Sequence, residues 1–130
     1  MRAKLQSTRA EPTLVTTEQK QRFADALKRV AGDVELLVSI ASLVTEDAPA
    51  VFSKLKFQLA AGELSDAATT GHQLKGMLST FETDGPVIML QELIHSARGG
   101  DKKEAVGVLS SCEADIEELL TEIRELGEGA

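Results

Sequence analysis

The 130-residue chain contains no tryptophan, no tyrosine and only four phenylalanines, so aromatic residues make up 3% of it. Nucleic-acid recognition depends on basic patches and on rings that stack against bases. Here the net charge is −7, and lysine and arginine are spread along the chain instead of clustered. We therefore expect no nucleic-acid partner, and the same negative charge argues against binding to an anionic membrane surface.

Cysteine occurs once, at Cys112, which excludes an intrachain disulfide and suits a reducing compartment. No uninterrupted apolar run approaches the roughly 18 residues of a membrane span. Residues 1–12 also lack the apolar stretch of a signal peptide. These features predict a cytoplasmic protein that does not enter a membrane, with Cys112 as an inert thiol at a core position of the last helix.

Hydrophobic residues make up 42% of the chain, which is enough for one core in a single domain of this length. They recur at helical spacing, without the alternation of strands. The sequence predicts an all-α fold, an up-down antiparallel four-helix bundle over residues 17–127 with a short extra N-terminal helix. Residues 1–16 are expected to form a flexible tail.

The expected helices run over about residues 18–32, 34–61, 64–82, 86–98 and 102–126. Their predicted N-caps are Thr17, Asp33 and Asp101 for the first, second and last helix. Pro49 is expected either to kink the second helix or to split it. Three apolar residues of that helix lie off its core-facing side and predict a second contact, with the first helix as a candidate: Leu36, Leu43 and Phe57.

The stretch Gly71-His72-Gln73-Leu74-Lys75-Gly76 organises the third expected helix. Its core face is formed by Leu64, Ala67, Gly71, Leu74, Leu78 and Phe81. His72 points almost the opposite way, and its neighbours on that face are Ser65, Ala68, Thr69, Lys75, Gly76 and Ser79. We therefore expect an exposed imidazole among small side chains, with one cation beside it.

A glycine in the middle of a helix, as at Gly76, costs roughly 1 kcal/mol relative to alanine. The apolar pattern needs no turn there, so the simplest reason is clearance for the backbone of another molecule. Neutral imidazole is a nucleophile that can take a phosphoryl group, and Lys75 would stabilise the charge of a phosphorylated His72. The sequence places no base, metal ligand or phosphate-binding loop nearby, which indicates that the other half of the reaction lies on a partner.

The pentapeptide His72-Gln73-Leu74-Lys75-Gly76 resembles the His-x-Leu-Lys-Gly signature of histidine-containing phosphotransfer (HPt) domains. The resemblance covers about residues 18–126 and includes the segments 33–37 and 97–101. It implies a continuous, bent second helix. It also implies that the chain is no enzyme with kinase activity of its own, but a carrier that relays phosphoryl groups between aspartates of response-regulator receiver domains through His72.

The resemblance further implies roles for the surrounding residues. Lys75 would assist electrostatically, Gly76 would give the partner clearance, and Ala68 and Ser79 would add room. Gln73 and Ser79 are candidates for hydrogen bonds to a phosphoryl oxygen or to the partner. No cofactor or metal is expected on this chain, because Mg²⁺ would come with the receiver. A hybrid histidine kinase would stand upstream, and we expect a monomer.

The chain departs from the family pattern after Gly76. Small residues, then an asparagine and a glycine near the helix end, are common there, whereas this sequence has Met77, Leu78, Thr80, Phe81 and Glu82. Glu82 puts in question how the helix ends and which receiver is accepted. Two alternatives stay open: a non-catalytic helical adaptor that binds a receiver, and the phosphoacceptor module of a histidine kinase. His95 also faces outward. A metal site shared by His72 and His95 would need further ligands, which the sequence does not place nearby, so we expect His95 to be an ordinary surface residue.

Overall fold

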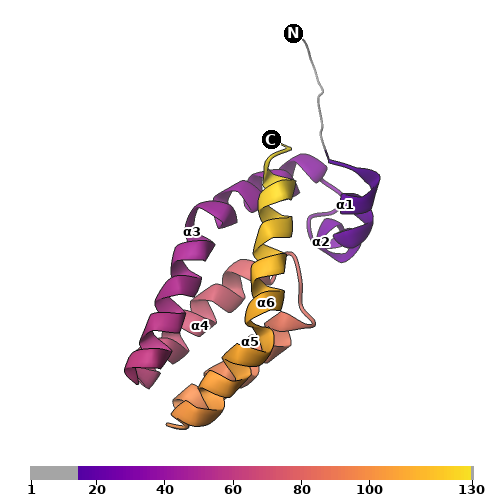
Figure 1. Ribbon diagram of the computed structural model, residues 1–130. Helices are drawn as coiled ribbons and strands as arrows, with labels where there is room; N and C mark the ends of the chain where they lie inside the picture. Colours follow the sequence, from indigo (N-terminus) through magenta and orange to yellow (C-terminus); the bar gives the residue numbers. More distant parts are fainter. Residues whose placement is uncertain (1–14, 130) are drawn as a thin grey trace.

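The computed structural model describes residues 15–129, and this part of the chain contains helices and turns but no strand. The helices are α1 (Thr17–Arg22), α2 (Ala24–Arg29), α3 (Val34–Ala61), α4 (Leu64–Leu78), α5 (Pro86–Arg98) and α6 (Lys102–Gly127) (Figure 1). The all-α prediction is confirmed for the described residues. Most of the predicted tail, residues 1–14, lies outside them.

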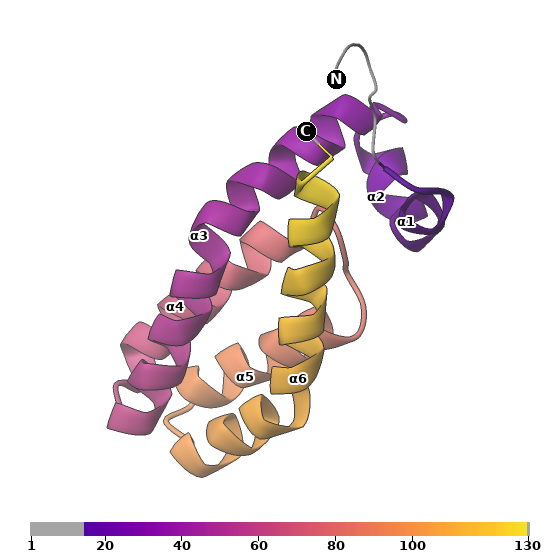
Figure 2. The same ribbon diagram turned by 45° about the horizontal axis from the view of Figure 1, so that its top comes forward.

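The four longer helices pack around one hydrophobic core (Figures 1 and 2). α3 lies against both α4 and α6, and α5 also lies against both, so the four helices form a closed arrangement. α1 and α2 sit at one end, beside the start of α3. The largest fully buried side chains are Phe23, Leu37, Leu55, Leu59, Leu74, Leu78, Leu90, Leu93, Ile94, Ile116, Leu119 and Ile123.

The predicted caps of α3 and α6 are confirmed. The carboxylate of Asp33 accepts a hydrogen bond from the Leu36 amide at 3.0 Å, and that of Asp101 accepts one from the Glu104 amide at 3.0 Å. Gly62 ends α3 in the left-handed conformation, with φ of 76°, which a side chain would strain. These local signals fix the ends of the two longest helices.

The single first helix predicted over 18–32 is wrong, because Phe23 breaks it into α1 and α2. Phe23 has φ of −107° and ψ of 32°, outside the helical region, and its ring packs edge-on against Phe81 with centroids 5.8 Å apart. This contact with a distant segment overrides local helix propensity. The N-cap is Thr16, not Thr17: its hydroxyl accepts from the Gln19 amide at 3.0 Å.

Two residues of the predicted tail therefore belong to the folded part. Thr16 caps α1 in a reciprocal capping box, because the Gln19 side chain accepts a hydrogen bond from the Thr16 amide at 2.9 Å. Val15 packs against the core and lies beside Gly129 near the end of the chain. The described fold thus includes Val15 and Thr16, which precede the predicted start at residue 17.

Pro49 does not split α3, which runs as one helix of 28 residues and curves in the view of Figure 1. By length and composition α3 is apolar enough to cross a membrane, although no uninterrupted apolar run suggested this. The core helix of a protein without any membrane contact can have the same composition, and α3 does pack against α4 and α6.

The second contact predicted for the off-core residues of α3 is wrong for the described part of the chain. Leu36 is 46% exposed, Leu43 63% and Phe57 69%. Of α3, the first two helices cover only the start, and they leave this face open. α3 therefore carries large apolar side chains that nothing described here covers.

The C-terminal turn of α6 lies directly on the backbone of α3. A Cβ at Gly127 would stand 2.9 Å from the amide nitrogen of Ser42 and 3.1 Å from its Cα, so the approach requires a residue without a side chain. α6 ends at Gly127, one residue later than predicted. This contact joins segments that are far apart in the sequence.

α4 ends at Leu78, four residues before the predicted end at Glu82. The segment that follows is held by α1: Arg22 donates to Glu82 at 2.9 Å and pairs with Glu122 at 3.0 Å. Burial lowers the pKa of Arg22, but the hydrogen bonds to both carboxylates outweigh it, and the pKa is raised. Glu82 thus has an intramolecular partner, which explains how a charged residue is accommodated where the family pattern has small ones.

Candidate functional site

His72 lies near the middle of α4, on the side that faces away from the core. Its side chain is exposed, as predicted, while Gly71 and Leu74 beside it are buried. No hydrogen bond or ion pair to the ring occurs within residues 15–129. The imidazole is therefore exposed on a packed helix, and neither ring nitrogen bonds to a described residue.

The two glycines of the motif have different surroundings. Gly71 is buried, and a Cβ there would stand 3.0 Å from Cγ1 of Ile94, so the glycine allows α4 and α5 to pack closely. Gly76 is exposed, and a Cβ there would meet nothing within 4 Å. Its φ is not positive either. The fold itself does not require a glycine at position 76, and the clearance expected there for another molecule stays a prediction.

Lys75 is half-buried and held by α5. Its ammonium donates a hydrogen bond to the side-chain oxygen of Gln91 at 2.6 Å. Because the amide is neutral, this contact positions the positive charge without cancelling it, as a carboxylate would. Gln91 stands one helical turn before the outward-facing His95, but only the packing of α4 on α5 sets it opposite Lys75. Gln91 is thus a site residue that the sequence did not reveal.

The prediction that Ala68 offers room to a partner is wrong. Ala68 is 3% exposed, because α5 covers that side of α4. Ser79 is half-buried, and its hydroxyl donates to the carbonyl of Gly76 at 2.9 Å, which satisfies the donor within the helix. Gln73 is exposed. The accessible surface of the motif is therefore formed by His72, Gln73 and Gly76, with the Lys75 ammonium at its edge.

His95 is also exposed, as predicted for a surface residue. Within residues 15–129 no group of three or more His, Cys, Asp and Glu side chains is arranged to hold a metal ion. The chemistry that this surface offers by itself is that of a single nucleophilic imidazole with a cation nearby.

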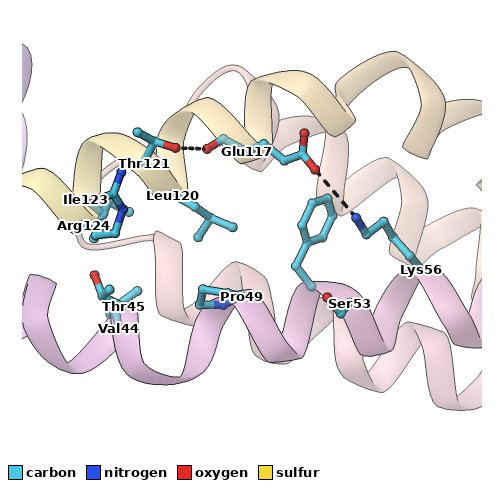
Figure 3. A pocket seen from close by; sticks show the side chains of 11 residues that line it. Val44, Thr45, Pro49, Ser53, Lys56, Glu117, Leu120, Thr121, Ile123 and Arg124 are labelled. Atoms are coloured by element: carbon cyan, nitrogen blue, oxygen red, sulfur yellow. Dashed lines mark hydrogen bonds and ion pairs between the residues drawn. The ribbon is translucent and has the colours of Figure 1, made fainter.

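A groove of about 250 Å³ lies elsewhere, between α3 and α6 (Figure 3). Lys56 closes part of it: its ammonium lies 3.2 Å from Glu113, 3.7 Å from Glu117 and 4.6 Å from the ring centre of Phe52. The single ammonium offsets only one of the two carboxylates, so these three groups keep one negative charge. The residues lining the groove are Val44, Thr45, Pro49, Phe52, Ser53, Lys56, Glu117, Leu120, Thr121, Ile123 and Arg124, so no residue of α4 takes part.

Cys112 lies in the core of α6, as predicted, and is 1% exposed. Burial raises the pKa of the Cys112 thiol to about 11, and the negative charges of Asp115 and Glu113 add to the effect. A thiol in this environment is not a nucleophile near neutral pH, because the thiolate is the reactive form. His72 is therefore the only candidate nucleophile that the motif and the described structure agree on.

Comparison of the chain with protein-family models, curated proteins and solved structures finds no match.

Proposed function

We propose that this protein is a phosphoryl carrier of the HPt type. A ring nitrogen of His72, Nε2 in our assignment, attacks the phosphorus of an aspartyl phosphate on a receiver domain. The new P–N bond forms as the P–O bond to the aspartate breaks, and the carboxylate leaves in line with the attack. The group then passes to the aspartate of a second receiver by the reverse step. One observation carries the proposal: an exposed, unpartnered imidazole beside a glycine that its own fold does not need.

The fold supports this chemistry by positioning. We propose that α3–α6 form the up-down antiparallel four-helix bundle implied by the resemblance, supported by their closed packing and by the short connections between them. Transfer between proteins requires the nucleophile and the phosphorus to meet at a fixed distance and direction. A ring carried in the middle of a packed helix meets that requirement better than one on a loop.

Lys75 supplies positive charge where the phosphoryl group would lie. Its contact with Gln91 holds the ammonium at the boundary of α4 and α5, on the same side of α4 as His72. In this proposal the receiver brings Mg²⁺ and most of the groups that stabilise the transferring phosphoryl, and a hybrid histidine kinase loads the first receiver. The carrier works in the cytoplasm and has no kinase activity of its own.

The experiment is transfer of labelled phosphate from a panel of phosphorylated receiver domains to wild type, His72→Gln and His95→Gln. His95→Gln is a matched control, because it removes an equally exposed imidazole from the neighbouring helix α5. We expect an acid-labile label on wild type and His95→Gln and none on His72→Gln. Label retained by His72→Gln would overturn the proposal.

Two further outcomes separate the alternatives. A receiver that binds all three proteins while none becomes labelled assigns the chain to the adaptors. Labelling of wild type by a histidine kinase and ATP, in the absence of any receiver and with no transfer from receivers, assigns it to the phosphoacceptor modules of such kinases. Circular dichroism of each variant confirms that the helical fold is intact.

A further inference from the structure

The exposed face of α3 carries four apolar residues at intervals of seven: Leu36, Leu43, Ala50 and Phe57, which we call the α3 stripe. Leu36 is 46% exposed, Leu43 63% and Phe57 69%, and Ala50 is exposed as well. Seven residues are nearly two helical turns, so the stripe runs along one side of the helix. Contacts between helices that pack lengthwise also repeat every seven residues, although the intervening contact positions of that pattern, Glu46 and Ser53, are polar here.

Three exposed charges lie within about one turn of Ala50, with Glu46 on one side of the α3 stripe and Asp47 and Lys54 together on the other. Asp47 stands three residues before Ala50 and Lys54 four residues after it, so both lie next to Ala50 on the same side of α3. Both side chains are exposed, and neither forms an ion pair within residues 15–129. The centre of the stripe is therefore a small residue between an unpaired anion and an unpaired cation.

We propose that the α3 stripe is the contact surface of a homodimer in which α3 of a second copy crosses antiparallel, with the two-fold axis at Ala50. In this arrangement residue i lies opposite residue 100 − i of the second copy. Leu43 then meets Phe57 of the second copy, twice by symmetry. Asp47 falls within one residue, about 1.5 Å along the axis, of the position opposite Lys54.

The charges select the antiparallel direction. A parallel pair would hold the two copies of Asp47, and likewise of Lys54, at the same height but on opposite sides of the contact, so neither charge would meet an opposite one. The antiparallel pair forms two Asp47–Lys54 ion pairs instead. Ala50 at the crossing allows the two backbones to approach closely, and the larger Leu43 and Phe57 fill the space on either side, where the helices diverge.

A second copy accounts for a further property of α3. An apolar 18-residue window of this helix has 33% of its residues buried within the chain, and α3 exposes three large apolar side chains. Two crossing helices bury less than the roughly 1,200–2,000 Å² of a standard interface, so the dimer is weak and dissociates on dilution. This dimer departs from the monomer expected from the resemblance, and it does not depend on the proposed phosphoryl transfer.

The first test is sedimentation of the full chain at concentrations from about 1 μM to about 1 mM, the range in which small interfaces dissociate. We expect the mass to rise from 13.9 kDa towards twice that value. Asp47→Lys and Lys54→Asp should each weaken the dimer about tenfold, because two attractive pairs become repulsive. The double variant should restore it, while Glu92→Lys on α5, an equal change of charge, should have no effect.

The second test is oxidative cross-linking through single introduced cysteines, with Cys112 buried and out of reach. Ala50→Cys should form a disulfide dimer because position 50 faces itself, and Leu43→Cys should not. Cross-linking of both variants would indicate a parallel pair and overturn the proposal. A protein that stays monomeric at all concentrations would also overturn the proposal. The same holds if wild type binds lipid vesicles and Leu43→Asp abolishes that binding.

A third outcome separates this proposal from the phosphoryl carrier function. If the chain is monomeric and Leu43→Asp slows phosphoryl transfer while His72 stays reactive towards a small phosphoryl donor such as phosphoramidate, the stripe is the docking surface of the receiver and the dimer is refuted. If Leu43→Asp abolishes the dimer and transfer continues at the wild-type rate, the proposal holds. Circular dichroism again confirms that each variant is folded.

Discussion

Replacing Gly76 by alanine tests whether the glycine serves the fold or a partner. A Cβ at position 76 meets nothing within 4 Å, so the substitution should stabilise the isolated protein by about 1 kcal/mol through helix propensity alone. Gly107 in α6 offers a matched control, because it is also exposed in a helix and a Cβ there also meets nothing within 4 Å. Both variants should unfold at a higher urea concentration than wild type.

Gly71→Ala should behave differently in the same assay. Its Cβ would stand 3.0 Å from Cγ1 of Ile94, and crowding in a packed core costs about 1–3 kcal/mol, which cancels or exceeds the gain in propensity. The assay is urea unfolding followed by circular dichroism at 222 nm, because the chain has no tryptophan to report by fluorescence. We expect Gly76→Ala and Gly107→Ala to be stabilised, and Gly71→Ala to be neutral or destabilised.

Phosphoryl transfer then distinguishes the two exposed glycines. Gly76→Ala should slow transfer from the receiver, and the longer side chain of Gly76→Gln should slow it further, by about tenfold or more if about 1.4 kcal/mol of docking energy is lost. Gly107→Ala should transfer at the wild-type rate. If Gly76→Gln is stable and transfers as fast as wild type, the clearance argument is refuted.

Two further predictions concern residues outside the motif. The Cys112 thiol, with its pKa raised to about 11, should react slowly with a disulfide reagent at pH 8 in the native protein and rapidly in urea. The unfolded thiol ionises near pH 8.5, so between about pH 9 and 11 the native state binds one proton that the unfolded state has lost. The free energy of unfolding should therefore fall as the pH rises through this window. A free energy of unfolding that does not change with pH there would contradict the raised pKa. Arg22→Ala removes ion pairs to Glu82 and Glu122, and should lower the free energy of unfolding by about 1–2 kcal/mol. Glu82→Gln should lower it by less, because Glu122 remains, and equal losses would show that Glu82 is the only effective partner.

The local signals in the sequence predicted the helices well where each signal depends on its own neighbours. Asp33 and Asp101 cap the helices that follow them, Gly62 ends α3, and Pro86 occupies the first turn of α5. Each of these effects involves residues within one turn, so periodicity and capping rules are sufficient. Pro49 shows the limit of such rules, because they left a kink and a split both open, whereas α3 continues through it as one helix.

The features that the sequence did not predict depend on contacts between distant segments. The break at Phe23 follows from its packing on Phe81. The burial of Ala68 and the hydrogen bond of Lys75 to Gln91 follow from the side on which α5 lies against α4. A helical wheel gives the direction of a side chain relative to its own axis, but not which neighbour covers it. Exposure of His72 was predictable because it points directly away from the core face.

The packing of Gly127 on Ser42 has a consequence for how the chain assembles. α3–α4, α4–α5 and α5–α6 each join neighbours in sequence, whereas the seam between α3 and α6 joins residues 85 positions apart at this point. Closing so long a loop costs more chain entropy than closing the short loops between sequential helices, so we expect this seam to form last during folding and to open first under strain. Backbone amide hydrogen exchange should then be faster in the last turn of α6 than in the middle of α4. The helix that carries His72 would stay folded while the contact between α3 and α6 opens locally.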